Sequence, residues 1–227
     1  MGFAAHAAHD PRMLVGEDGQ ALVEAALVLP TTVFAILATV QLTQLQQARI
    51  LAESAAFAAA RAGIVMNGDP ARMLDAATLA LLPAVGPTDS IAAMAETLVR
   101  FKARDAVLER FGLRQLRVVV RNPVSADFAS FGQHLRGEEI DFDDVRPAAG
   151  EAALLSLQLR FLCELRVPFV NKLLQALWLA ARGAAPAEDV PLTALAAAAR
   201  AGRYYLPLQA FSTMRMQSNP YLKWARP

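Results

Sequence analysis

Glu24 is the only charged side chain in the longest apolar stretch of the sequence, residues 20–41. A carboxylate within a bilayer costs roughly 2.5–3.5 kcal/mol on insertion scales, so it usually has a cationic partner. No Lys or Arg lies one helical turn away. If the chain were cut between Gly19 and Gln20, the new α-amine of Gln20 would be largely protonated near neutral pH, four residues before Glu24. That amine could neutralise the Glu24 carboxylate of a neighbouring subunit.

The helix that must position these groups is predicted to cross a membrane and to continue beyond it. A bilayer core needs about 20 apolar residues, which residues 20–41 supply. Pro30 is expected to remove a hydrogen bond and kink the axis, and the Thr31 and Thr32 hydroxyls can bond preceding carbonyls. The helical pattern persists to residue 66, before a turn signal at 67–70. About 44 residues of helix at ~1.5 Å each would be roughly 66 Å long, twice a bilayer, so we expect a stem that projects from the membrane.

The distal part of this stem has a ridge of small residues, for which two interpretations remain open. Such a ridge lets two helices approach closely, so it could contact a neighbouring stem. It could equally lie on the chain's own folded body. The ridge consists of Ala52, Ala55, Ala56, Ala59 and Ala60.

Residues 1–19 are predicted to form a leader with no packed element, ending in a turn-forming Glu17-Asp18-Gly19. In a secretory signal peptide, the cleavage site follows the apolar stretch. Here the plausible cleavage site precedes it, so we do not expect a secretory signal.

The remaining chain predicts an α+β body. Helices are expected at Ala71–Leu82, ended by a Pro83–Pro87 loop, and at Ser90–Phe111, with Asp89 or Ser90 as the N-cap. The approximate core positions of the second helix are Ile91, Met94, Leu98, Phe101, Ala106 and Leu108.

Three segments alternate as strands do, and we expect an antiparallel sheet. They are Leu116–Val120, Leu155–Val167 and 204–216. In the second, Leu157, Leu159, Phe161, Cys163, Leu165 and Val167 share an apolar face, with Gln158, Arg160, Glu164 and Arg166 opposite. Residues 124–150 are predicted to be a long polar loop.

The apolar segment Phe169–Ala181 is too short to span a bilayer. It could lie on the membrane surface, with Lys172 and Trp178 at the interface, or pack on the sheet. These two placements are not separable from sequence. A further helix is expected at Leu192–Ala201, and Asn219–Pro227 should be a frayed tail.

The residue content gives no support for catalysis, a metal or a cofactor. The single cysteine, Cys163, excludes an internal disulfide and falls on an apolar strand face. His6, His9 and His134 are scattered, and the carboxylates of 138–146 lack the EF-hand order of ligands, so a solvated loop is expected there. No GxSxG, HExxH or P-loop occurs, so we expect no enzyme and no catalytic residues. The 22 basic and 21 acidic residues form no basic block that would indicate nucleic acid.

The motif GQALVEAALVLP, starting at Gly19, resembles the N-terminus of the TadE/TadG-like pilins, minor subunits of the Tad (Flp) type IV pilus system. Ala48-Arg49 and Ala58–Gly63 are similar to the family's stem, and 206–215 is similar to its closing strand. The resemblance implies a leader that prepilin peptidase removes after Gly19, and it places Glu24 at the family's fifth position after the cut. A basic leader would suit a cytoplasmic N-terminus, but this leader has three acidic residues, Asp10, Glu17 and Asp18, and one basic residue, Arg12. Acidic residues contribute little to orientation.

The resemblance implies a minor pilin or pseudopilin with a processing site at Gly19 and Gln20 and an assembly role for Glu24. Its expected domains are a leader at 1–19, a transmembrane stem at 20–66, a periplasmic domain at 70–218 and a tail at 219–227. The implied partners are prepilin peptidase, other pilin subunits and inner-membrane lipid, but no nucleic acid. The implied location is the bacterial inner membrane, single-pass, with incorporation into an extracellular pilus as a further outcome. The alternative is an uncleaved single-pass anchor that carries a periplasmic binding domain.

Overall fold

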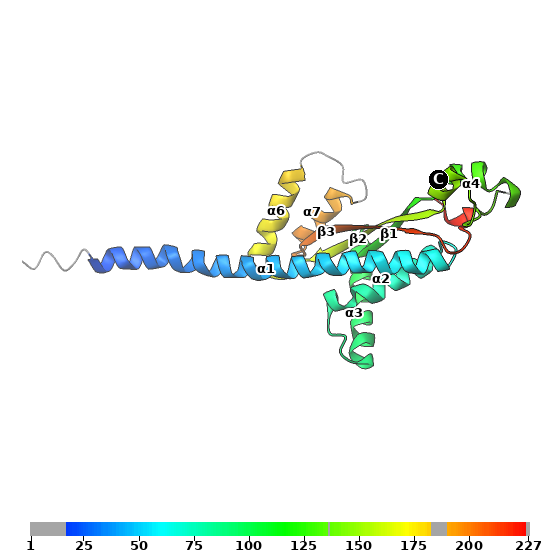
Figure 1. Ribbon diagram of the computed structural model, residues 1–227. Coiled ribbons are helices and arrows are strands. Elements are labelled where there is room, and N and C mark those ends of the chain that lie inside the picture. The colour runs from blue at the N-terminus through cyan, green and yellow to red at the C-terminus, as the bar shows by residue number, and fades with distance from the viewer. Residues whose placement is uncertain (1–16, 136, 183–189, 226–227) are drawn as a thin grey trace, which may run out of the picture.

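The computed structural model describes residues 17–135, 137–182 and 190–225. It confirms the α+β class: a long N-terminal helix carries a three-stranded antiparallel sheet with flanking helices. Figure 1 shows the body gathered around the C-terminal part of this helix. In chain order the elements are α1 (Glu17–Val65), α2 (Pro70–Val85), α3 (Ile91–Glu109), β1 (Leu116–Asn122), α4 (Ser125–Phe131), η2 (Gln133–Leu135), α5 (Pro147–Ala152), β2 (Leu154–Glu164), α6 (Val170–Arg182), α7 (Leu192–Arg200), β3 (Tyr205–Arg215) and η3 (Leu222–Trp224).

Helix α1 begins at Glu17, so the prediction of a turn at residues 17–19 is wrong. The helical pattern that follows from Gln20 continues back over these three residues. The rest of the predicted leader, residues 1–16, lies outside the described residues.

Helix α1 runs through Pro30 as one element of 49 residues, about 74 Å at ~1.5 Å per residue. Figure 1 shows no sharp bend along it, in contrast to the predicted kink. The Thr31 hydroxyl donates to the Leu27 carbonyl and the Thr32 hydroxyl to the Val28 carbonyl, both at 2.8 Å, as predicted. Pro30 has no backbone N–H and so donates no helical hydrogen bond. The two threonine hydroxyls are additional hydrogen-bond donors in the same part of the helix.

The sheet has the order β1-β2-β3, and β2 pairs antiparallel with both neighbours. Leu159 is opposite Val118 on one side and Ala210 on the other. Because β2 is the central strand, the side chains on each of its faces are flanked by side chains of β1 on one side and of β3 on the other. Gln158 and Arg160 are therefore buried, at 4% and 5% exposure, although they lie on the predicted polar face.

The apolar face of the sheet packs on α1 and α2. The alanine ridge of α1 faces this core, and each of its five alanines is at most 1% exposed. Packing on the chain's own body is thus the correct interpretation of the ridge, which is not available to a neighbouring stem. Gly63 continues the close approach, since a Cβ there would lie 2.6 Å from both Leu155 Cδ2 and Met73 Sδ.

Helix α3 is capped by Ser90, whose hydroxyl accepts from the Ala93 N–H at 3.1 Å, as predicted. Of its predicted core positions, Phe101 and Leu108 are buried, whereas Ile91, Met94 and Ala106 are exposed. The reason is visible in Figure 1: α3 projects from the body, so most of its length has no element opposite. Helix α2 also differs slightly from prediction, because it continues through Pro83.

The predicted polar loop 124–150 is wrong as a description, because it contains α4, η2 and α5 around a small core of their own. Phe128 and Ile140 are at most 1% exposed. The acidic residues shape turns: the Asp141 carboxylate accepts from the Asp143 N–H at 3.0 Å, and the Asp144 carboxylate accepts from the Arg146 N–H at 2.9 Å.

The expectation of a frayed tail is also wrong for residues 219–225. The Asn219 amide donates to Glu139 Oε2 at 3.0 Å and accepts from the Phe142 N–H at 3.2 Å. Glu139 and Tyr221 form a β-bridge. The sequence missed this contact because it joins segments about 80 residues apart.

Candidate assembly helix and processing segment

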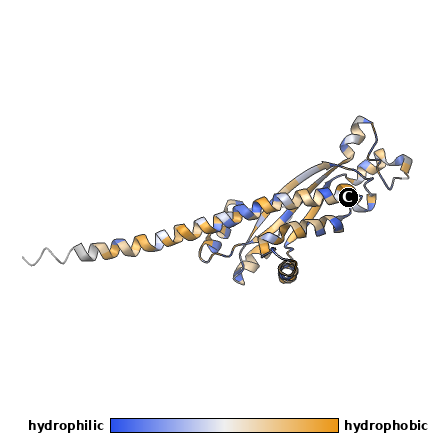
Figure 2. Ribbon diagram, turned by 60° about the horizontal axis from the view of Figure 1, so that its bottom comes forward, coloured by the Kyte–Doolittle hydropathy of each residue, from blue (hydrophilic) through white to orange (hydrophobic). Residues whose placement is uncertain are grey.

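The first part of α1 stands clear of the body. Residues 21–40 are exposed except for the half-buried Leu37 and Ala38, and they form about 30 Å of helix at ~1.5 Å per residue. Figure 2 shows this projecting rod as predominantly hydrophobic. Among the described residues, α1 is the one helix long and apolar enough to cross a membrane. Its exposed length matches the hydrocarbon thickness of a bilayer.

Glu24 lies near the start of this exposed segment, and its side chain is exposed. In the described part of the chain it forms no ion pair; the first ion pair along α1 is Arg49–Glu53, at 3.4 Å. No Lys or Arg occurs between Glu24 and Arg49. The Glu24 carboxylate is therefore placed where any charge partner within the membrane must come from outside this helix.

The peptide bond between Gly19 and Gln20 lies in the first turn of α1. The first four N–H groups of a helix have no intrahelical acceptor, so opening this turn breaks few hydrogen bonds. The described backbone thus places the predicted scissile bond at the least stabilised part of the helix.

Comparison with protein families identifies this region. Residues 19–61 match the family model of TadE-like proteins. The match confirms the predicted resemblance, and the family implies a membrane protein related to the Tad pilus. Searches of curated proteins and of solved structures gave no match. The matched residues include Gly19, Gln20 and Glu24. All of them lie within α1, so the match covers none of the body's strands.

The first fully buried residue of the TadE-like helix is Gln41, which is 1% exposed. The Gln41 side-chain Oε1 accepts from the backbone N–H of Val167 at 2.9 Å, just after β2. Sequence reasoning placed Gln41 only as the end of the apolar run. The single signal for its second role was a polar amide at the point where hydrophobicity ends.

The opposite end of the TadE-like helix is bonded to the segment after β3. The Ile64 carbonyl accepts from the Gln217 N–H at 3.0 Å and from the Ser218 hydroxyl at 2.9 Å. The Asn67 side chain donates to the Asn219 carbonyl at 2.8 Å. Terminal carbonyls of a helix lack intrahelical donors, so these contacts satisfy part of the α1 C-terminus.

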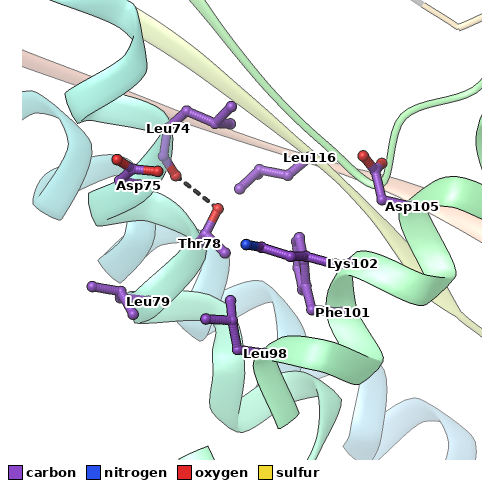
Figure 3. Close-up of a pocket in the computed structure, with 9 residues that line it drawn as sticks. All are labelled: Leu74, Asp75, Thr78, Leu79, Leu98, Phe101, Lys102, Asp105 and Leu116. Carbon is purple, nitrogen blue, oxygen red and sulfur yellow. Dashed lines mark hydrogen bonds between the residues drawn. The ribbon is translucent and has the colours of Figure 1, made fainter. Parts of the chain in front are cut away.

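A cavity of about 400 Å³ lies between α2 and α3 and is shown in Figure 3. Most of its lining is apolar, and two of its four polar residues, Thr78 and Asp105, form hydrogen bonds that stabilise the fold. Thr78 donates to the Leu74 carbonyl at 2.7 Å, and Asp105 accepts from the Gln115 N–H at 2.7 Å and from Arg114 at 3.2 Å.

A second hollow lies between α1 and the C-terminal end of β2 and contains the ion pairs of Glu164 with Arg104, at 3.6 Å, and with Arg166, at 3.9 Å. Burial lowers the pKa of Arg104, and the Glu164 carboxylate partly offsets this effect. Cys163 also lines the hollow but is 9% exposed. The Arg104–Glu164 ion pair joins α3 to the C-terminal end of β2.

Cys163 is predicted to be unreactive in the folded protein. Burial raises the pKa of its thiol to about 11, so the thiol stays protonated at pH 8, and the nucleophilic thiolate accumulates only as the pH approaches that pKa. Iodoacetamide at pH 8 should leave native protein unmodified and alkylate it fully in urea, as read by intact mass. A Val99→Cys chain, with a new thiol at a 67% exposed site, should gain one adduct without urea. Equal labelling of Cys163 in the native and unfolded states would contradict its place in the core.

Proposed function

We propose that the chain is a minor pilin or pseudopilin of a Tad-type assembly, processed between Gly19 and Gln20 and packed into that assembly through α1. The observation that carries this proposal is the TadE-like helix itself. Its exposed apolar segment starts within two residues of the proposed cut and carries one unpaired acid, Glu24, among the described residues.

Processing would supply the partner that Glu24 lacks. A prepilin peptidase would hydrolyse the peptide bond, leaving a carboxylate on Gly19 and a free amine on Gln20. That amine is largely protonated near neutral pH. Paired with the Glu24 carboxylate of an adjacent subunit, it would remove two unpaired charges from the low-dielectric interior of a helix bundle.

The packing of the body decides which part of α1 would meet other subunits. The alanine ridge is already covered by α2 and the sheet, so it is not part of the intermolecular surface. The proposed surface is the exposed segment 21–40, held in the inner membrane before assembly with the body in the periplasm. Other pilin or pseudopilin stems would replace lipid along this segment.

The decisive experiment is to identify the mature N-terminus in cells that make the pilus. Intact-mass and N-terminal analysis of the membrane fraction should find a chain that begins at Gln20. A Gly19→Leu chain should keep its leader, since a bulky side chain replaces the glycine before the cut. A Gly2→Leu chain is the control and should be cleaved normally.

Retention of residues 1–19 in the unmodified protein, under conditions in which the pilus is made, would overturn the proposal. That result would favour the alternative, an uncleaved single-pass anchor with a binding domain.

A further inference from the structure

Helix α6 is the element of the body closest to the projecting part of α1. Figure 1 shows it leaving α1 at a steep angle, on the side of the body from which the N-terminal part of α1 extends. The residues just before α6 are tied to α1 by the Gln41–Val167 hydrogen bond. If α1 stands upright in a bilayer up to Val40, α6 is held beside the surface of that bilayer.

The side of α6 that faces the body is partly polar. Gln175 is 1% exposed, and its amide donates to the Leu195 carbonyl of α7 at 3.4 Å. Trp178 packs on the cluster formed by α7 and the end of α3. In Figure 1, α7 lies on the distal side of α6, so the opposite side of α6 is turned toward the projecting segment.

The outward side of α6 is apolar. Leu173 and Leu177 are 44% and 56% exposed, and each lies about 160° around the helix from the buried Gln175. Phe169, which immediately precedes α6, is 79% exposed and is a third exposed apolar side chain at this end of the body. The apolar residues of an amphipathic helix in water usually face the core, as Val170 and Trp178 do, whereas Leu173 and Leu177 face outward.

Phe169 is also held in an unfavourable backbone conformation. Its φ is 66°, in the left-handed region that bulky residues rarely adopt, within a tight turn closed by the Val170 N–H and the Pro168 carbonyl at 2.8 Å. A strained, exposed aromatic residue at this position is unexplained by contacts within the chain.

We propose that the outward face of α6, consisting of Leu173 and Leu177 together with the preceding Phe169, is a lipid-binding surface that seats the body on the membrane from which α1 emerges. The proposal rests on the membrane-spanning role of α1 in the proposed function. The three apolar side chains enter the boundary between headgroups and acyl chains. The exposed Lys172, about 100° around the helix from Leu173, reaches anionic headgroups with its ammonium while its stem lies along the side of α6.

Continuity with the spanning segment selects lipid over a protein partner. Leu37 and Ala38, one turn before Gln41, are half-buried, whereas residues 21–36 are exposed. The body's cover on α1 therefore begins within the last turn of the apolar segment. A helix in an interface lies with its apolar face roughly 5–10 Å into the headgroup boundary, and this junction places α6 beside the end of the apolar segment, where that boundary would lie.

The test uses the full chain in nanodiscs of phosphatidylethanolamine and phosphatidylglycerol, on a Cys163→Ala background. Spin labels are placed by Leu173→Cys and Leu177→Cys, with Val99→Cys on α3 as an exposed aqueous control and Val33→Cys on α1 as a membrane control. Collisions with oxygen and with a water-soluble nickel chelate are then measured. The oxygen-to-nickel ratio at the two α6 sites should exceed that at Val99→Cys several-fold and approach that at Val33→Cys.

Each other outcome identifies which idea fails. An aqueous ratio at both α6 sites, with Val33→Cys in lipid, overturns the lipid-binding surface and leaves the spanning helix intact. An aqueous ratio at Val33→Cys as well means that α1 does not span, so the proposed function fails. Protection from both reagents at α6 overturns lipid contact in favour of a protein covering this face.

Discussion

A Glu24→Ala chain is expected to be cleaved like the unmodified chain and then to be lost from the assembled fraction almost completely. The carboxylate is not needed for the fold, since in the described part of the chain it is exposed and forms no ion pair. Its removal leaves the new amine of each neighbouring Gln20 without a counter-charge in the membrane, and an unpaired charge there costs roughly 2.5–3.5 kcal/mol per subunit. This penalty recurs with every subunit added.

The measurement is the ratio of assembled to membrane-bound protein, read together with the intact mass of both fractions. Glu53→Ala is the matched control, because Glu53 is an exposed glutamate of the same helix whose pairing with Arg49 is worth only about 0.3–0.5 kcal/mol. Glu24→Asp, which keeps the charge, should restore part of the assembly. Normal assembly of Glu24→Ala would exclude the charge-pairing role while leaving the processing step untouched.

An Ala59→Leu chain is expected to have a body destabilised by about 1–3 kcal/mol or more. Ala59 is fully buried between α1 and the core formed by α2 and the sheet, so three added carbons must displace packed side chains. Urea unfolding in detergent micelles, followed by the fluorescence of Trp178 and Trp224, should show a lowered midpoint. Both tryptophans lie in the body, so the spanning segment contributes no signal.

Ser54→Leu is the control for this variant, since Ser54 is exposed on the same stretch of α1. Leucine is a better helix former than serine, so its midpoint should be unchanged or slightly raised. An unchanged midpoint for Ala59→Leu would mean that the ridge is not packed as described, and the choice between body and neighbouring stem would reopen.

The fold was predictable where the signal is local. Alternation over Leu155–Val167 gave a strand that the structure confirms as β2, and Ser90 caps α3 as its residue type indicates. The sequence did not predict correctly which helix faces are covered by other elements of the fold. Ile91 and Met94 have the spacing of core residues but lie on a helix that projects into solvent, because coverage depends on elements distant in sequence.

The same distinction applies to the candidate site. Gly19, Gln20 and Glu24 lie within six residues, so their pattern was readable before any fold was known. The contacts that fix the body on α1 were not readable. Gln41 and Val167 are separated by 126 positions, and Asn67 and Asn219 by 152, and single polar residues in helices or turns carry no mark of such partners.

The bonding of the chain's C-terminal segment to the far end of α1 has a mechanical consequence. A pull along the axis of α1 loads β2, β3 and the alanine ridge in shear, because these elements run beside the helix. The hydrogen bonds from Gln217 and Ser218 to the Ile64 carbonyl also hold the C-terminal end of α1 to the body. Contacts loaded in shear must yield together, so a subunit drawn out of the membrane by its stem would travel as one rigid piece.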